Sequence, residues 1–473
     1  MSMHRIAGVL IALALAGCAV GPDYQQTATE QPQWHSAIPH GGKLEDLSKW
    51  WEQLNDTLLS DLILGTEQGN PTLDMALARL NEARANETAS TGVYYPALAL
   101  GASSTRSRIA FGQQVILQTN NKVGFDASWE LDLFGKNRRT AEAAQARFKA
   151  SEIAWHDARI SLAAEVADVY IELRQCEAGL ATAEQNQQSR ATVRKLIDLK
   201  AGAGLASPMD AARAQVGEAE GDSAYRAKQG ECARVLNRLT ALTGIDRDTL
   251  TTRLAERSGQ IPLPNETDVS SVAAHALSQR PDVAIAEFNL ASASADIGAS
   301  KAAMYPSLTL LGSVASNNIS QGGRNTVVPT WSFGPSLSIP LFSGGRASAN
   351  VAAAQARYDY AQASYQKTVR EAVRNVEDSL MRLNVANARA QRAHQAQDKY
   401  QQLFNATQAR YDTGLGNRIA LEDARRVWLQ SQDQAAAMER ERVSSWIALY
   451  KALGGGWQRE AHADKLAEND TKK

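Results

Sequence analysis

The chain has 473 residues, a formal net charge of −1 and a charged fraction of 21%. This near-neutral balance gives no support for nucleic-acid binding, which usually shows as a basic patch or stripe. A mean hydropathy of −0.35 is typical of a chain exposed to water. No stretch beyond the N-terminus reaches the roughly eighteen consecutive apolar residues of a membrane helix, so a membrane crossing by the mature chain would have to use strands.

The N-terminus has the features of a secretory signal. His4 and Arg5 precede an apolar run that ends in the sequence LAGC at residues 15–18. This ending resembles the lipobox of bacterial lipoproteins, in which the cysteine becomes the lipidated first residue of the mature chain. The alternative is an ordinary signal with a chance cysteine. Because Ala19, rather than an aspartate, follows Cys18, the outer membrane is the expected destination.

Two Ala-rich helical stretches are bounded by prolines. The first runs from Pro71 to Pro96 and the second from Pro281 to Pro306, so both spans are 25 residues long and the offset between them is 210. Each span ends in a Tyr-Pro pair. Agreement in both length and boundary residues indicates an internal repeat.

Alternating segments follow each helical stretch, which indicates strands with one apolar and one polar face. The clearest are residues 123–133 (VGFDASWELDL) and 331–341 (WSFGPSLSIPL). Each is preceded by a shorter alternating segment and a polar connection, at 112–122 and 319–328. Each pair of strands is therefore predicted to be a hairpin with a polar loop at its tip.

A long helix without proline follows each hairpin and folds back at a Gly-rich turn, at residues 202–204 and 414–416. One seam of the second long helix steps by four and three residues, the spacing of a left-handed coiled coil; it consists of Val369, Val373, Val376, Leu380 and Leu383. Such a helix, roughly 65 residues long, would span about 95 Å. This length suits a protein that crosses a compartment.

The expected organisation is a duplication of helix, hairpin, long helix, turn and helix. In residue ranges it comprises a signal peptide (1–17), an N-terminal lipidated and equatorial segment (18–69), a first repeat (70–243, with hairpin 97–134, long helix 136–200 and helix 207–243), an equatorial linker (244–267), a second repeat (268–453, with hairpin 307–342, long helix 345–412 and helix 418–453) and a C-terminal tail (454–473). Four strands cannot close a membrane barrel, because known barrels need at least about eight. Since an open sheet edge is untenable in lipid, the chain is expected to oligomerise.

Taken together, these features resemble the outer membrane efflux protein family, the TolC-like outer membrane factors of tripartite efflux pumps, and best its lipoprotein branch. The resemblance extends from Cys18 to about Gly456. It is carried by the lipobox followed by Gly21-Pro22-Asp23-Tyr24, the Trp50-Trp51 pair followed by Leu58, Leu62 and Ile63, Asn70-Pro71, the two Tyr-Pro pairs and the Leu-Phe-x-Gly strand exits.

This resemblance implies a mainly α fold with membrane β-strands. It implies a homotrimer with a twelve-stranded outer-membrane β-barrel, four strands coming from each protomer, continued by a twelve-helix periplasmic α-barrel and a mixed equatorial domain. The implied function is a passive exit channel for small molecules such as drugs and toxic compounds, anchored by lipid in the outer membrane. The implied partners are a periplasmic membrane-fusion adaptor and an inner-membrane pump of the RND type or similar.

The resemblance also places a closed periplasmic gate at the tip of the second repeat. The family's gate motif falls on Arg410, Tyr411, Asp423 and Arg426, with Ile419 at the apolar constriction position and Glu422 beside the acid. Three copies of Asp423, with Glu422 as a further candidate, would ring a narrow axis and concentrate cations there. The arginines and the tyrosine would tie neighbouring helices into the closed form.

A second interpretation of acids after a turn is that they favour a helix N-terminus. It fits the first repeat, where Ser207 and Asp210 have the spacing of a capping box with Pro208 at the first helical position. It fits Asp423 less well, because Asn417 is the better candidate cap. The two tips, residues 200–208 and 412–420, are expected to contact the adaptor; the alternative is that they are plain exposed turns.

Two cysteines remain beyond Cys18. The midpoint of Cys176 and Cys232 is residue 204, in the first Gly-rich turn, so two antiparallel helices that fold back there would bring the cysteines to one height. The periplasm favours disulfides, provided that the Cα atoms approach to within about 7 Å. We predict a disulfide; the alternative is two buried thiols that never meet.

Three acids, Asp126, Glu130 and Asp132, lie on the polar face of the first repeat's clearest strand. They are expected to face the barrel lumen if the apolar face contacts lipid, and to bias the pore toward cations; a merely solvated face is the alternative. The sequence contains no nucleophile motif, no metal-ligand spacing and no phosphate loop, so no catalytic residue and no cofactor is predicted. The competing functions are a duct for type I protein secretion and, in a different class, a structural periplasmic coiled-coil lipoprotein or adaptor.

Overall fold

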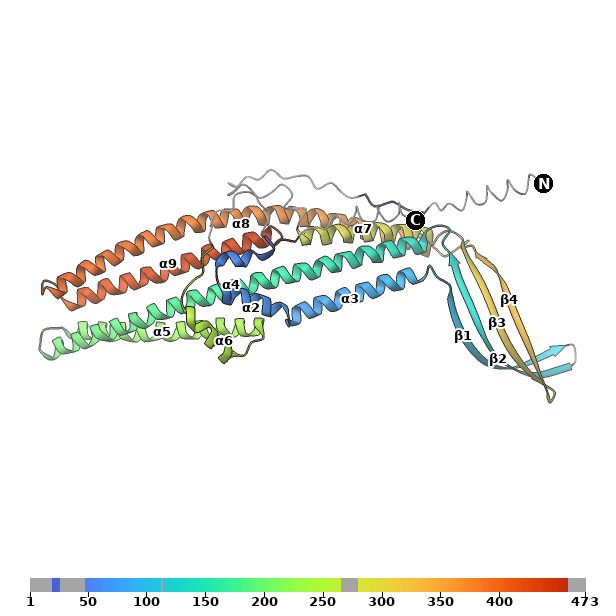
Figure 1. Cartoon of the computed structure of the whole chain (residues 1–473), viewed down its shortest axis with the longest axis horizontal. Helices are drawn as coiled ribbons and strands as arrows, with labels where there is room; N and C mark the ends of the chain where they lie inside the picture. Colours follow the sequence, from blue (N-terminus) through green and yellow to red (C-terminus); the bar gives the residue numbers. More distant parts are fainter. Residues whose placement is uncertain (1–18, 26–46, 112–113, 265–279, 458–473) are drawn as a thin grey trace. The chain divides into compact units, whose positions relative to one another are not determined.

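The computed structural model describes residues 19–25, 47–111, 114–264 and 280–457. Within these ranges the elements follow one another as drawn in Figure 1. In chain order they are η1 (Leu47–Leu54), α2 (Thr57–Glu67), α3 (Pro71–Gly92), β1 (Ala97–Phe111), β2 (Gln114–Leu131), α4 (Lys136–Gly202), α5 (Pro208–Thr243), α6 (Arg247–Leu254), η2 (Ala255–Arg257), α7 (Pro281–Ala302), β3 (Ser307–Gln321), β4 (Arg324–Ser338), α8 (Arg346–Asp412) and α9 (Arg418–Ala452).

The chain forms two compact units, and both repeats contribute to each of them. Of the described residues, the first unit contains 19–25, 78–111, 114–153 and 284–368, and so includes the strands. The second contains 47–77, 154–264, 280–283 and 369–457.

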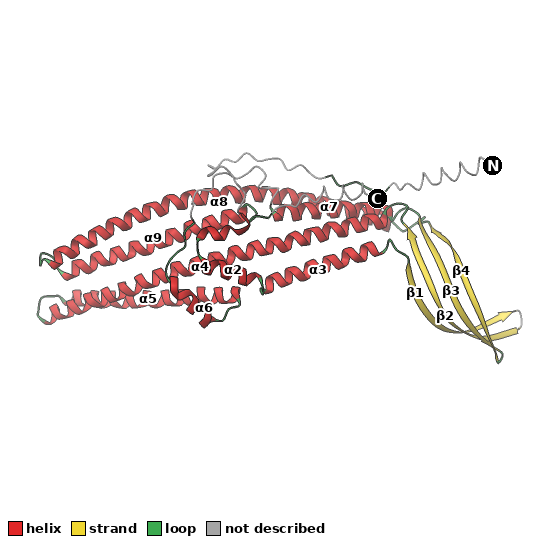
Figure 2. Ribbon diagram, in the orientation of Figure 1, coloured by secondary structure: helices red, strands yellow, loops and turns green. Residues whose placement is uncertain are grey.

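In the first unit, the four strands form one antiparallel sheet in the order β1-β2-β3-β4 (Figure 2). Its register aligns Leu100, Phe125, Val314 and Trp331 in one row across all four strands. These side chains share a face and are 53–80% exposed. The neighbouring row points to the other face and is polar, with the Ser313 and Ser332 hydroxyls 2.8 Å apart. A slip of one residue would move every side chain to the opposite face, so this register is what puts these apolar and polar rows on opposite faces of the sheet.

The hairpins differ from the prediction at their tips. Most of the predicted polar connection 112–122 belongs to a strand, because β2 already begins at Gln114, and β3 and β4 are joined by Gly322 and Gly323 alone. Both glycines have positive φ, as two-residue hairpin turns require. The prediction failed because the hydrogen bonds between strands join backbone groups. A segment of polar residues can therefore form a strand as well as an apolar segment can.

The strands also end earlier than the alternation predicts. Strand β4 stops at Ser338, two residues before Pro340, which has no N–H to donate to a ladder. Strand β2 stops at Leu131, and a turn with Gly135 at φ 79° leads into α4. At this turn the Asp132 carboxylate accepts a hydrogen bond of 2.7 Å from the Arg138 backbone N–H.

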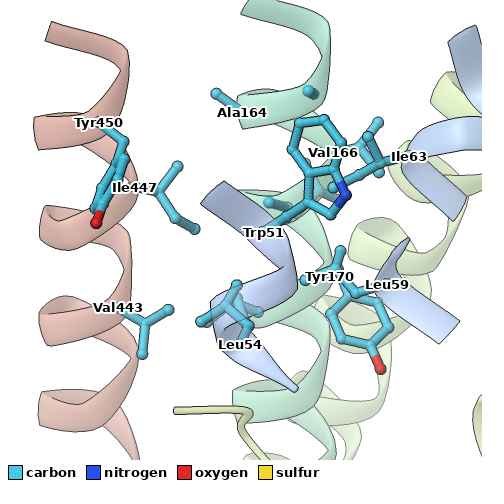
Figure 3. Packing of buried hydrophobic residues seen from close by; sticks show 14 of the residues in the cluster. Trp51, Leu54, Leu59, Ile63, Ala164, Val166, Tyr170, Val443, Ile447 and Tyr450 are labelled. Atoms are coloured by element: carbon cyan, nitrogen blue, oxygen red, sulfur yellow. The ribbon is translucent and has the colours of Figure 1, made fainter. Parts of the chain in front are cut away.

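The core of the second unit is built around the two tryptophans of the N-terminal segment. Trp50 is buried, and its ring lies 5.8 Å from that of Trp446 on α9. Figure 3 shows Trp51 and Leu54 between α4, which carries Val166 and Tyr170, and α9. On α8, the lower part of the predicted seam is buried at Val376, Leu380 and Leu383, whereas Val369 and Val373 are partly exposed. The N-terminal segment therefore fills the space between helices of both repeats.

The residue before each repeat's first proline holds the end of that repeat's last helix. The Asn70 side chain donates to the Leu242 carbonyl at 2.8 Å, and the Arg280 guanidinium donates to the Ala452 carbonyl at 2.6 Å. The sequence separation is 172 residues in both cases. The duplication is thus preserved in a tertiary contact even though the two side chains differ.

A buried polar network joins the N-terminal segment to the linker. Asp56 caps α2 by accepting from the Leu59 N–H at 3.0 Å, and it also accepts from the Tyr170 hydroxyl at 2.8 Å. Arg174, which is fully buried, donates to that hydroxyl at 3.0 Å and to the Leu254 carbonyl at 2.7 Å. Burial raises the pKa of Tyr170, so its hydroxyl stays protonated and can donate.

Candidate functional site

The tip of the second repeat is a short turn between α8 and α9. The Leu415 N–H donates to the Arg410 carbonyl at 2.9 Å, and Gly414 has a φ of 75°. Asn417 caps α9 by accepting from the Ala420 N–H at 2.8 Å, which confirms the cap predicted from the sequence. The turn thus fixes where α9 begins and which of its side chains face outward.

The two neighbouring acids of α9 have opposite environments. The Asp423 side chain is 56% exposed and pairs with Arg426 one turn later. Glu422 is fully buried: its carboxylate accepts from the Ser189 hydroxyl of α4 at 2.8 Å and lies 2.7 Å from Arg418 and 3.3 Å from Arg425. Consecutive residues on a helix differ by about 100° in direction, so only one of the two can face away from the bundle.

This burial corrects the expectation that Glu422 is a second candidate for a ring around an axis. Its carboxylate is committed to contacts within one chain, across α4 and α9. Of these two neighbouring acids, Asp423 is the one that is exposed.

The other predicted gate residues are brought together only in part. Arg418, rather than Arg410 or Arg426, lies over the Tyr411 ring, 5.5 Å from its centroid. Arg410 is exposed, and Ile419 is half-buried next to Arg418. The basic residues that organise this tip are therefore those around Glu422.

The tip of the first repeat has the same backbone pattern. The Leu205 N–H donates to the Lys200 carbonyl at 2.7 Å, as Leu415 does to Arg410. Ser207 and Asp210 form the predicted capping box, with Pro208 in the first turn of α5. The Asp210 carboxylate accepts from the Ser207 N–H at 3.2 Å and the Asp210 N–H donates to the Ser207 hydroxyl at 3.1 Å, and the Ser207 groups lower the pKa of Asp210.

Between the tip and the core of the second unit, Cys176 of α4 and Cys232 of α5 form a disulfide with Cα atoms 5.5 Å apart. The closed loop spans 56 residues and includes the whole first tip. The second repeat has no cysteine, so its helix pair lacks such a link.

Each of the three acids predicted to face the barrel lumen has a polar partner in the chain. Asp126 lies 3.8 Å from Lys122, and Glu130 lies 3.4 Å from Lys136. Asp132 lies beyond the end of the strand and is bound at the start of α4, which corrects its assignment to the strand. The negative charge that these residues present is therefore smaller than the sequence alone indicates.

Three further features concern the lipidated cysteine, metal ligands and membrane-spanning helices. Cys18 lies outside the described residues. No cluster of three or more potential metal ligands occurs within the described ranges. None of the helices described here combines the length and the hydropathy that a membrane-spanning helix needs.

The comparison with known families gives the decisive match. The model of a family described as outer membrane efflux protein matches residues 62–245 and 272–455, which are the two repeats. The chain belongs to the outer membrane efflux protein family. This family consists of channel proteins rather than enzymes, and the match confirms the family recognised from the sequence.

Individual relatives agree with this assignment over nearly their whole length. The solvent efflux pump outer membrane protein SrpC of Pseudomonas putida is 30% identical over 466 residues, which cover 94% of this chain and 97% of that protein. The cation efflux system protein CusC of Escherichia coli O157:H7 is 30% identical over 470 residues, with coverages of 97% and 100%.

Solved structures support the same fold. The outer-membrane channel OprN matches with a TM-score of 0.80 and 28% identity, covering 93% of this chain and all of that one. The open state of the MtrE outer membrane channel of Neisseria gonorrhoeae matches with a TM-score of 0.78 and 25% identity, covering 94% and 100%. This outer membrane efflux protein therefore has the mainly α, TolC-like channel fold that the sequence predicts.

Sequence reasoning missed the buried cluster around Glu422 in this efflux protein. Its local signal was present, because Arg418 and Arg425 stand four residues before and three residues after Glu422, the spacings at which helical side chains meet. Ser189 carries no such signal, since it is 233 residues away in the sequence.

We predict that replacing both Cys176 and Cys232 by serine lowers the free energy of unfolding by about 2–5 kcal/mol, because the unfolded chain regains the freedom of the closed loop. Thermal unfolding of the solubilised efflux protein, followed by circular dichroism, measures this. Ser444→Ala, which removes the hydrogen bond from the Ser444 hydroxyl of α9 to Asp168 of α4, is the control for the loss of one ordinary contact between helices. An unchanged midpoint, with two free thiols found by intact mass in the unaltered periplasmic protein, contradicts the prediction.

Proposed function

We propose that this outer membrane efflux protein works as a homotrimer whose three sheets join into one twelve-stranded barrel, continued by a twelve-helix periplasmic barrel. The sheet carries this proposal: β1 and β4 are its edge strands, and its apolar face is exposed in the single chain. In lipid, each unpaired backbone group costs several kcal/mol, so β4 of one protomer pairs with β1 of the next. The apolar row then contacts lipid and the polar face lines the water-filled lumen.

The proposed channel is anchored to the outer membrane through a lipidated Cys18, and it docks to a periplasmic adaptor through its tips. Leu205 and Leu415, at equivalent positions of the two turns, are 77% and 76% exposed. An apolar side chain that both repeats leave in water at the same place supports contact with a partner protein. An inner-membrane pump supplies the energy, since the channel itself is passive.

The gate of the proposed channel is a ring of three copies of Asp423. Its exposure supports this role, and the burial of Glu422 next to it supports Asp423 as the ring member. Like charges in a constriction resist close approach and concentrate cations. Within each chain Arg426 offsets part of the Asp423 charge, and in the proposed closed form Arg426, with Arg410 and Tyr411, ties neighbouring helices together. Assembly with the adaptor opens it.

The proposed cargo is small molecules such as drugs and other toxic compounds. The relatives' names include a solvent pump protein and a cation efflux protein. Similar ducts thus serve chemically different cargo, which supports the view that the partner pump selects the substrate. In the lumen, Asp126 and Glu130 contribute a weak preference for cations, because Lys122 and Lys136 offset part of their charge.

We predict that deletion of the gene makes the host more sensitive to at least one class within a panel of antibiotics, dyes, solvents, aromatic acids and metals. Expression of the intact chain restores resistance, and expression of the chain with its two tip leucines replaced by aspartate (Leu205→Asp, Leu415→Asp) does not, because docking is lost. Unchanged sensitivity of the deletion strain across the panel contradicts an efflux function. Loss of protein secretion from that strain would instead favour the duct for type I secretion.

We also predict that Asp423→Ala, alone or with Arg426→Ala, raises the single-channel conductance in planar bilayers at least about twofold. The reason is that the closed ring loses its negative charge and, in the double variant, the arginine that links neighbouring helices. The matched control is Asp412→Ala, which removes an exposed acid of the same tip that is not part of the proposed ring. Conductance that is the same for Asp423→Ala and the unaltered protein, or that rises equally in the control, refutes the gate.

A further inference from the structure

The residues directly after Cys18 lie in a fixed position on the first unit. We call Ala19–Tyr24 the N-terminal strap. The Val20 N–H donates to the Phe134 carbonyl at 3.1 Å, and a side chain added to Gly135 would lie 2.9 Å from the Ala19 Cβ. The strap therefore begins at the turn between β2 and α4, where the sheet ends.

An ion pair fixes the other end of the strap. The Asp23 carboxylate accepts from the Arg139 guanidinium at 2.6 Å, and Glu142 accepts from the same guanidinium at 2.8 Å. The Arg139 side chain is only 6% exposed, so a buried charge on α4 is neutralised by a residue of the strap. Arg139 also lowers the pKa of Asp23. The contact is thus present above the ordinary Asp pKa of about 3.9 and is lost only as pH falls below it, so it is fully formed at neutral pH.

The middle of the strap packs against backbone. Gly21 has a φ of 113°, and a Cβ there would lie 2.5 Å from the Gly298 Cα on α7. A Cβ on Gly298 would in turn lie 2.8 Å from the Arg139 Cγ. Strap, α7 and α4 therefore meet at a point where only glycine fits at position 21.

We infer that the strap is a positioning device for the lipid anchor, holding the acyl chains on Cys18 beside the foot of the sheet so that anchor and strands enter the same patch of the bilayer. The inference rests on the proposed lipidation and trimeric barrel. Ala19, which directly follows Cys18 in the sequence, packs at the turn that ends β2. Near this foot Leu341 and Phe342 are 91% and 93% exposed, which supports a lipid surface as the partner.

The physical benefit is a high effective concentration of strands at the membrane. An anchor on a loose tether keeps the protein at the bilayer but lets the sheet search a large volume. The effective concentration falls roughly as the −3/2 power of tether length. A short strap in a fixed position leaves the sheet little volume to search.

The test measures how fast newly made protein becomes a heat-resistant trimer in a pulse-chase experiment, with palmitate labelling of every variant. Gly21→Ala and Arg139→Gln break the strap. A third variant inserts about ten Gly/Ser residues, with a reach of roughly 18 Å, between Cys18 and Ala19. This insertion begins with alanine, so the residue after the cysteine is unchanged, and it leaves the strap intact. Lys149→Gln removes a positive charge from α4 outside the strap and is the control.

We expect all three variants to incorporate palmitate and to form trimer at least about threefold more slowly than the unaltered chain, and the control to match it. The insertion is decisive, because a strap that only stabilises the fold is not affected by it. Trimer formation at the normal rate in the insertion variant overturns the positioning role while leaving the channel intact. Absence of palmitate from the unaltered chain overturns the lipid anchor, and the positioning role with it.

Discussion

The structure depends on the need to pair backbone groups at the two edges of a four-stranded sheet. The register sorts side chains so that one face is apolar across all four strands, as in the row from Leu100 to Trp331. Such a face is stable only against lipid or another apolar surface, and lipid offers no partner to the free N–H and C=O groups of β1 and β4. The proposed self-association would satisfy both requirements at once, and it would make the oligomer a condition of the fold rather than an addition to it.

Within the second unit, contacts between distant segments fasten the two repeats to each other. Asn70 and Arg280 fasten the ends of the two repeats with contacts of equal sequence separation, although one is an amide and the other a guanidinium. The network of Asp56, Tyr170 and Arg174 joins the N-terminal segment to α4 and the linker. At the sheet end, the strap brings the beginning of the chain to the strand exit. Each of these contacts joins segments that are distant in the sequence.

Much of the fold could be predicted because its signals are local and occur twice. The period of two before Gly135 and the helical pattern after it locate the strand exit, and the proline spans locate the first helix of each repeat. The lengths of the hairpins could not be predicted, because polar residues such as those after Gln114 pair as well as apolar ones in a ladder. Asp132 was placed on the strand because alternation alone cannot detect that its carboxylate binds the start of α4.

At the tip, sequence reasoning found the right helix and the right caps but could not separate two adjacent acids. Asp423 and Glu422 differ by one residue, and their environments are decided by Ser189 on another helix. The position of the two cysteines could be foreseen because a helical hairpin relates residues by distance from its turn. The buried Arg174 could not, since one of its partners, the Leu254 carbonyl, lies 80 residues away in the sequence.

We propose that the sheet is completed only by further copies of the same chain. Native mass spectrometry of the detergent-extracted protein tests this proposal most directly. We expect one species that contains three chains and withstands mild heating. A stable, folded monomer as the predominant species would contradict it.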